Sequence, residues 1–233
     1  MNIIKAVAVC NKGKIRGNNE DNLLFQYQYL EEMHDGIAGV WEHAPASTDI
    51  PALYGVFDGM GGHSKGEYAS YVAAAVANQM VLIHPVDDTN ITGLMDQICM
   101  ESNDIICKKV KNENLLIGST VAMVCFHENK CVCCNLGDSP VFRLRNGELD
   151  ELYEEHTERK VREMIFGKEA VKGKKFSLTQ HLGISLEDMQ IVPYICEEDV
   201  QKGDIYLLCS DGLTDMVEME EVHHILKGNI ELK

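Results

Sequence analysis

VFDGMGGHSKGEYAS, residues Val56 to Ser70, joins a short apolar run to a segment of small residues with helical character. The run ends in a single carboxylate, Asp58, and the turn that follows is rich in glycine and contains His63. An Asp-Gly pair is common in tight turns. A carboxylate beside bare backbone also leaves room for a bound group, so two interpretations are open and the rest of the chain must decide between them.

Length and composition indicate an ordinary globular chain. The 233 residues are 45% hydrophobic, enough for one sizeable domain with its own core. A formal charge of −16 at pH 7 argues against direct nucleic-acid binding, because a phosphate backbone attracts stripes of Lys and Arg. No apolar run is long enough for a membrane span and the N-terminus lacks a signal-peptide layout, so we expect a cytoplasmic protein without membrane association.

The nine cysteines are scattered through apolar segments. Cys131 to Cys134 reads CVCC and contains a C-x-x-C spacing, but no second pair stands at a zinc-like distance. The run is bounded by turn residues. We therefore interpret it as a buried strand in which cysteine acts as a small hydrophobic residue.

Apolar periodicity predicts strands separated by two consecutive helices. Strands are expected at residues 3–9, 21–25, 53–57, 120–126, 131–136, 141–144 and 205–209, and helices over about 64–80 and 91–110. Met33 to Pro51, rich in Gly, Pro and Ala, is expected to be a long loop. This order lacks regular β-α alternation and indicates an α+β fold with helices packed on antiparallel sheet.

Acidic residues recur at strand ends. Asp58-Gly59, Gly137-Asp138 and Asp211-Gly212 each follow an apolar strand, and Glu20-Asp21 precedes one. Neighbouring strands would bring these carboxylates into one cleft, where they repel unless protonated or neutralised by cations. Hard oxygen ligands select Mg²⁺ or Mn²⁺. On this interpretation, glycine follows Asp58 so that a hydrated cation can approach the backbone carbonyl of Gly59.

Six motifs in order resemble the bacterial form of the metal-dependent serine/threonine protein phosphatases (PPM, type 2C). They are Arg16-Gly17-Asn18-Asn19-Glu20-Asp21, Val56-Phe57-Asp58-Gly59-Met60-Gly61-Gly62-His63, Gly118-Ser119-Thr120, Asn135-Leu136-Gly137-Asp138-Ser139, Leu178-Thr179-Gln180-His181-Leu182-Gly183 and Cys209-Ser210-Asp211-Gly212-Leu213-Thr214-Asp215. The resemblance covers nearly the whole chain. It implies a four-layer α-β-β-α sandwich, in which two central antiparallel sheets are flanked by helices.

The resemblance also implies a site for two Mn²⁺ or Mg²⁺ ions, with a third, weaker site. Asp58 would bridge the two metals, the Gly59 carbonyl would bind one and Asp211 the other, and Glu20 and Asp21 would contact metal or its waters. Asp138 resembles the acid of the third site. Arg16 matches the arginine that binds the substrate phosphate. A water activated by the metals would hydrolyse phosphoserine or phosphothreonine without a covalent intermediate.

The roles of three residues and two departures from the family pattern need separate interpretation. His63 is either the general acid for the leaving oxygen or a polar residue of the turn without a catalytic part. Ser119 and Thr120 are interpreted as structural hydroxyls near the sheet edge. Pro140 stands where the family usually has arginine, and the flap between Glu155 and Leu178 is short and highly charged, which leaves its substrate selection open.

The chain end is the largest departure. The family closes with a helix and an Asp-Asn-Ile-Thr strand whose aspartate binds metal, whereas here Gly228 takes the acid's place before Asn229-Ile230. We therefore expect residues 1–233 to form one PPM-type domain that lacks its last helix and strand.

The leading functional hypothesis is a monomeric phosphatase acting on phosphoproteins that are targets of a bacterial serine/threonine kinase. A catalytically impaired regulatory or phosphoprotein-binding module is the alternative. A hydrolase of small phosphoesters is a third possibility.

Overall fold

A computed structural model describes residues 3–47, 51–61, 65–83, 90–114 and 116–228. The strands are β1 (Ile3–Ala8), β2 (Asp21–Phe25), β3 (Gln28–Tyr29), β4 (Trp41–Ser47), β5 (Ala52–Met60), β6 (Gly118–Ser119), β7 (Val121–His127), β8 (Lys130–Leu136), β9 (Val141–Arg145), β10 (Glu148–Glu151), β11 (Tyr194–Asp199) and β12 (Ile205–Leu208). The helices are α1 (Gly66–Ile83), α2 (Ile91–Glu113), α3 (Arg159–Phe166), α4 (Lys168–Val171), α5 (Asp211–Thr214) and α6 (Met219–Lys227).

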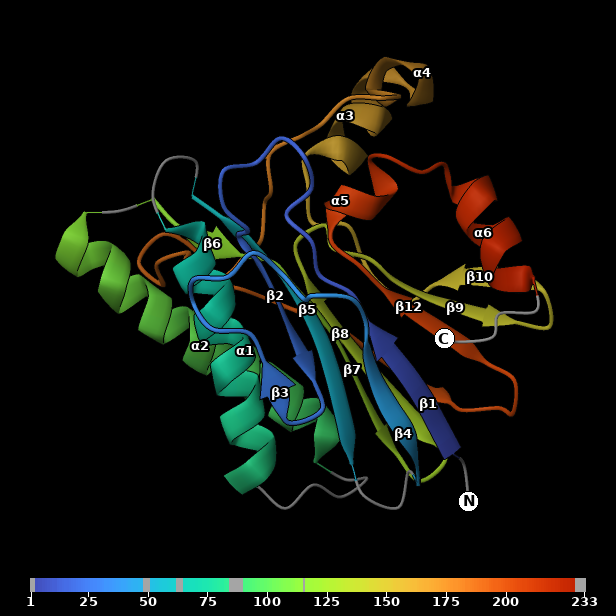
Figure 1. Cartoon of the computed structure of the whole chain (residues 1–233). Helices are drawn as coiled ribbons and strands as arrows, with labels where there is room; N and C mark the ends of the chain where they lie inside the picture. The colour runs from blue at the N-terminus through green and yellow to red at the C-terminus, as the bar shows by residue number, and fades with distance from the viewer. Residues whose placement is uncertain (1–2, 48–50, 62–64, 84–89, 115, 229–233) are drawn as a thin grey trace.

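Antiparallel sheets form the centre of the molecule (Figure 1). The largest has the order β11-β8-β7-β5-β2-β3, with the short β6 also paired to β5. Helices α1 and α2 cover one face of this sheet (Figure 1). The two-stranded sheet β1-β4 and the three-stranded sheet β10-β9-β12 lie against the other face (Figure 1). Helix α6 packs on β9 from the outside. The predicted α-β-β-α layering is confirmed.

The period-two alternation of the central strands fills two cores. On β7, Val121, Met123 and Cys125 face the core under α1 and α2, whereas Ala122, Val124 and Phe126 face the core between the sheets. Both faces of the strand are buried, which is why the sequence reads as one continuous apolar run. Alanines 69, 73 and 77 of α1 are fully buried against the sheet, so the helix axis can lie close to the strands.

The cysteines of the CVCC run behave as the sequence predicted. They lie on β8, and Cys131, Cys133 and Cys134 are fully buried free thiols. Burial raises the pKa of Cys125 on the neighbouring strand to about 12, which keeps this thiol protonated. These side chains therefore serve as small apolar groups of the core.

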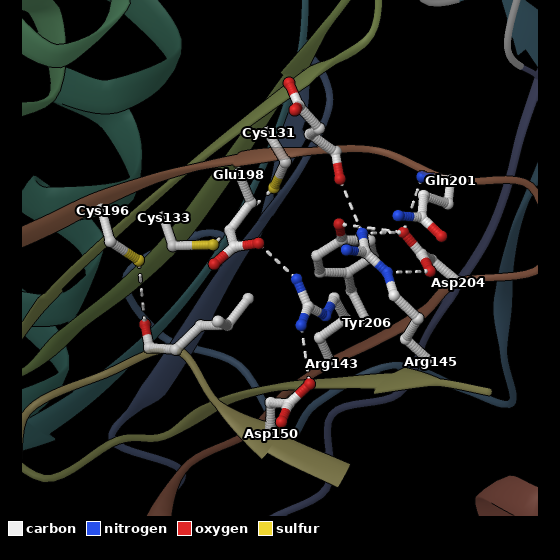
Figure 2. A network of polar contacts seen from close by, with 12 residues as sticks. Cys131, Cys133, Arg143, Arg145, Asp150, Cys196, Glu198, Gln201, Asp204 and Tyr206 are labelled. Atoms are coloured by element: carbon white, nitrogen blue, oxygen red, sulfur yellow. Dashed lines mark hydrogen bonds and ion pairs between the residues drawn. The ribbon is translucent and has the colours of Figure 1, made fainter. Parts of the chain in front are cut away.

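A network of ion pairs joins the β10-β9-β12 sheet to β11 of the large sheet (Figure 2). Arg143 of β9 donates to Glu198 of β11 and, at 2.6 Å, to Asp150 of β10. Arg145 of β9 donates to both carboxylate oxygens of Asp204 at 2.8 and 2.6 Å and to the Asp199 carbonyl at 2.6 Å. Strand β9 begins three residues after Asp138, so the network fixes the strand that follows a candidate site residue.

Several predicted boundaries need correction. The predicted loop at 33–51 contains β4, which pairs with β1. Strand β5 runs on through Met60, so Asp58 and Gly59 lie within a strand that continues beyond the predicted end at Phe57. The reason is that both gain partners there: Asp58 is paired to Asp21 of β2 and Gly59 to Ser119 of β6.

Some elements were not predicted, and one prediction stays open. The sequence did not predict strand β11 or helices α3, α4 and α6. The described helices include none that could serve as a transmembrane span. The prediction of a missing last strand concerns the chain end, whose residues 229–233 lie outside the described part, and it stays a prediction.

Candidate metal and phosphate site

Asp21 and Asp58 form the centre of the candidate site. They are directly paired across the antiparallel strands β2 and β5. Burial raises the pKa of both carboxyls, and each carboxyl also acts on the pKa of the other. Ser210 donates a hydrogen bond to Oδ2 of Asp21 at 2.8 Å. A residue that immediately precedes Asp211 thus fixes the Asp21 carboxylate across 189 positions of sequence.

Four of the predicted acids act on one another. Burial raises the pKa of Asp58 well above its ordinary value, and the charges of Asp21, Asp211 and Asp138 raise it further. Burial also raises the pKa of Asp21, which the hydrogen bonds from Ser210 and Asp58 partly offset. Burial, with the charge of Asp211, raises the pKa of Asp138 to about 6. The strand ends therefore bring these carboxylates together, as the sequence predicted.

Gly59 is bare for a reason that the sequence did not reveal. A Cβ atom at this position would lie 2.3 Å from the carbonyl oxygen of Glu20 and 2.3 Å from that of Gly66. The Gly59 N–H also donates to the Glu20 carbonyl at 3.1 Å. Three backbone segments meet here, and any side chain would push them apart. Space for a cation was the predicted reason, and close backbone packing is an additional one.

Buried hydroxyls hold the Asp58 backbone in place. The Thr120 hydroxyl accepts from the Asp58 N–H at 3.1 Å and lies 2.6 Å from the Ser139 hydroxyl. The Thr120 N–H donates to the Asp58 carbonyl at 2.9 Å. The Ser119 hydroxyl is turned to the Thr120 carbonyl at 2.9 Å. The prediction that Ser119 and Thr120 are structural hydroxyls is confirmed.

Asp211 begins the short helix α5 and is held by a residue of the flap. Lys175 Nζ lies 2.9 Å from Oδ2 of Asp211 and also forms an ion pair with Asp215. Lys175 is 36 residues from Asp211 in sequence and belongs to none of the six motifs, so no local pattern could have identified it.

The remaining predicted residues lie at the margin of this group. Burial and the neighbouring Glu67 raise the pKa of Glu20, and Arg16 acts in the opposite direction. Arg16 itself lies on the exposed segment before β2. His34 was not predicted from the sequence: burial lowers its pKa, and the neighbouring Asp21 acts in the opposite direction. His63 lies outside the described residues.

The donor set fits a hard divalent cation. Within the described part of the chain, no three His, Cys, Asp or Glu side chains converge as a ready metal cage. Asp21 accepts instead from Ser210, and Asp211 pairs with Lys175. The mutual repulsion that raises the pKa of Asp58 is nevertheless what a bound cation would relieve. Carboxylate oxygens without thiolates or imidazoles are the ligands of Mg²⁺ and Mn²⁺.

Known proteins are similar to this chain in sequence and in fold. The serine/threonine protein phosphatase PstP of Mycobacterium tuberculosis is 29% identical over 97% of the chain, which corresponds to 39% of that relative. The serine/threonine phosphatase stp of Listeria welshimeri is 30% identical over 94% of the chain and 81% of the relative. The PstP catalytic domain solved with two manganese ions has a TM-score of 0.71 at 25% identity, with 95% and 83% of the two chains covered.

The chain spans about two fifths of the length of the mycobacterial relatives that it matches. A family profile described as protein phosphatase 2C matches residues 43–227, the part that contains Asp58, Asp138 and Asp211. Solved serine/threonine phosphatases of Mycobacterium tuberculosis and S. agalactiae share the fold, with TM-scores of 0.74 and 0.77. The chain therefore belongs to the protein phosphatase 2C family.

Proposed function

We propose that this chain hydrolyses phosphoserine and phosphothreonine on proteins with the help of divalent cations. The observation that carries the proposal is the half-buried Asp21–Asp58 pair, with Asp138 and Asp211 close enough to raise the pKa of Asp58. A phosphate monoester is a dianion at neutral pH and would be repelled by these acids. Cations bound among the carboxylates reverse the sign of the local charge, polarise phosphate and lower the pKa of a bound water.

The ligand roles are those that the resemblance to the family implies. Asp58 would hold both of two cations, the Gly59 carbonyl one of them and Asp211 the other, and Glu20 and Asp21 would contact metal or its waters. Asp138 is assigned to a third and weaker site. The two manganese ions of the solved PstP domain support the count of two and the choice of Mn²⁺, and Mg²⁺ suits the same oxygen ligands.

The chain's other residues orient the reactants. The exposed Arg16 is suited to bind the substrate phosphate through two parallel N–H donors. Its influence on Glu20 supports a place beside the acids. Ser210 and Thr120 keep Asp21 and the Asp58 backbone in register. His63 is retained as a candidate proton donor to the leaving oxygen.

The substrates proposed here are phosphoproteins, the targets of a bacterial serine/threonine kinase. The names of the mycobacterial and Listeria relatives support this class. A monomer located in the cytoplasm is part of the same proposal.

Hydrolysis assays with two substrates test the proposal. The chain is incubated with p-nitrophenyl phosphate and with a phosphothreonine peptide, each with Mn²⁺, with Mg²⁺ and with excess EDTA. We expect turnover of both substrates that EDTA abolishes and Mn²⁺ restores. Asp58→Asn should be inactive, whereas Asp188→Asn, at an exposed acid far along the sequence, should match the parent chain. Turnover of neither substrate would favour a phosphoprotein-binding module, and turnover of p-nitrophenyl phosphate alone would favour a small-phosphoester hydrolase.

A further inference from the structure

Lys175 is a residue of the flap that contacts the candidate metal site. Its ammonium group pairs with Asp211 at 2.9 Å and with Asp215. Both acids come from the α5 segment, and the lysine side chain is still 71% exposed to solvent. An ammonium ion between two carboxylates supplies one positive charge at a position where the proposed function requires a cation.

The residues on both sides of Lys175 are tied to helix α3. The carbonyl of Lys174 accepts from Arg159 at 3.0 Å. The ring of Phe176 lies under the guanidinium groups of Arg159 and Arg162, at 5.3 and 5.7 Å from its centroid. Movement of the Lys175 backbone would therefore be transmitted to α3.

The base of the flap is fixed to the opposite side of the site. Thr157 is paired with Leu178, and the Thr179 N–H donates to the His156 carbonyl at 2.8 Å. The His156 N–H in turn donates to the Gly137 carbonyl at 2.9 Å, next to Asp138. The flap is thus attached through hydrogen bonds near Asp138 and through an exposed ion pair at Asp211. The exposed ion pair is the contact that can be exchanged at low cost.

We propose that Lys175 is an internal cation that binds Asp211 in the metal-free protein and is displaced when a divalent cation binds there, which releases the flap. This inference rests on the metal binding of the proposed function. A divalent ion and an ammonium group compete for the same carboxylate oxygen, so each lowers the affinity of the other. Metal loading and flap mobility are therefore coupled through one side chain.

Calorimetric titration of Mn²⁺ into four versions of the chain tests the competition. Lys175→Met removes the charge and should bind one Mn²⁺ about two- to five-fold more tightly than the parent, in keeping with the strength of an exposed ion pair. Lys175→Arg keeps the charge and should behave like the parent. Lys172→Met is the matched control, because Lys172 is an exposed lysine of the same flap with no ion pair among the described contacts. Equal or weaker Mn²⁺ binding by Lys175→Met would overturn the proposal.

Hydrogen exchange of residues 159–176 supplies a readout that does not depend on turnover. In EDTA, Lys175→Met should exchange faster in this segment than the parent, and saturating Mn²⁺ should bring the parent to the same rate. A parent flap that is unaffected by bound Mn²⁺ would overturn the release of the flap while leaving the phosphatase assignment intact. Absence of Mn²⁺ heat in all four versions would instead refute the proposed metal site, and the displacement with it.

Discussion

Asp21 and Asp58 face each other across two antiparallel strands, and the pKa of each carboxyl is raised, chiefly by burial. Two carboxylates paired in this way cannot both ionise without cost. Protein stability and catalysis therefore make opposite demands on this pair. A neutral pair suits the metal-free fold, and an ionised pair suits cation binding.

Asp58→Asn should separate these two demands. The amide keeps the shape and removes the buried charge, so we expect the metal-free variant to melt a few degrees above the parent at neutral pH, on the order of 1 kcal/mol. Mn²⁺ affinity and phosphatase activity should fall sharply, because a neutral amide is a poor ligand for two cations. Thermal melts in EDTA and calorimetry with Mn²⁺ measure the two effects. A variant that is less stable in EDTA and still binds Mn²⁺ normally would contradict both parts.

The raised pKa of Asp138 predicts how the stability of the metal-free protein depends on pH. Its pKa is about 6 in the fold, against about 3.9 for an unfolded aspartate. Between these values the folded state binds more protons than the unfolded state. The stabilisation is therefore present below about pH 4 and is lost as the pH rises through about 6, by roughly 1–3 kcal/mol.

Urea unfolding in EDTA between pH 4.5 and 7.5 checks the sign. Asp138→Asn should flatten the decline, and the exposed Asp188→Asn should leave it unchanged. The acids Asp21 and Asp58, whose pKa values are also raised, add to the decline in the same direction and will remain in Asp138→Asn. An Asp138→Asn profile parallel to the parent's would show that Asp138 titrates normally.

Gly59→Ala should destabilise the fold itself, whether or not metal is present. The added methyl group would meet the Glu20 and Gly66 carbonyls at 2.3 Å, and neither backbone atom can rotate away. We expect a loss of about 1–3 kcal/mol. Gly93→Ala is the matched control, since nothing lies within 4 Å of its added methyl and the residue sits in helix α2. That change should be neutral or stabilising by about 0.5–1 kcal/mol. Equal urea midpoints for the two variants would show that the three segments can separate freely.

Much of the site could be predicted from the sequence because its acids stand at the ends of strongly apolar strands. Asp58 lies near the end of β5, and Asp138 and Asp211 follow β8 and β12. Alternate side chains of the central strands point to opposite faces of the sheet, and both faces are buried. Antiparallel pairing then brings the strand ends together. The chemistry of the cluster followed from residue type alone.

The contacts made by the flap and the edges could not be predicted in this way. Strand β11 reads YICEED and mixes charged with apolar residues, because its partner β8 lies on one side only. Helix α3 carries Val161, Met164, Ile165 and Phe166, but the fold leaves all four exposed, so its apolar residues do not mark packing on the core. The pairing of Lys175 with Asp211 depends on how the flap returns to the sheet, which no local pattern encodes.

Arg16→Ala tests whether the exposed segment before β2 contacts substrate. Arg16 is exposed, and its charge partly offsets the rise that burial and Glu67 cause in the pKa of Glu20, which suits a cationic group beside the acids that can bind an anion. Losing its charge-assisted hydrogen bonds to phosphate should cost about 1.5–3 kcal/mol in kcat/KM, mainly as a higher KM for a phosphothreonine peptide.

Lys14→Ala, two residues earlier on the same exposed segment, is the matched control and should change kcat/KM little. Inorganic phosphate gives a second readout, because it should inhibit Arg16→Ala less strongly than the parent while Mn²⁺ affinity stays the same. If Arg16→Ala instead lowers kcat and Mn²⁺ affinity with KM unchanged, the arginine supports the acids through Glu20 and does not bind the phosphate. If both arginine and lysine variants raise KM equally, the segment acts only through its general positive charge.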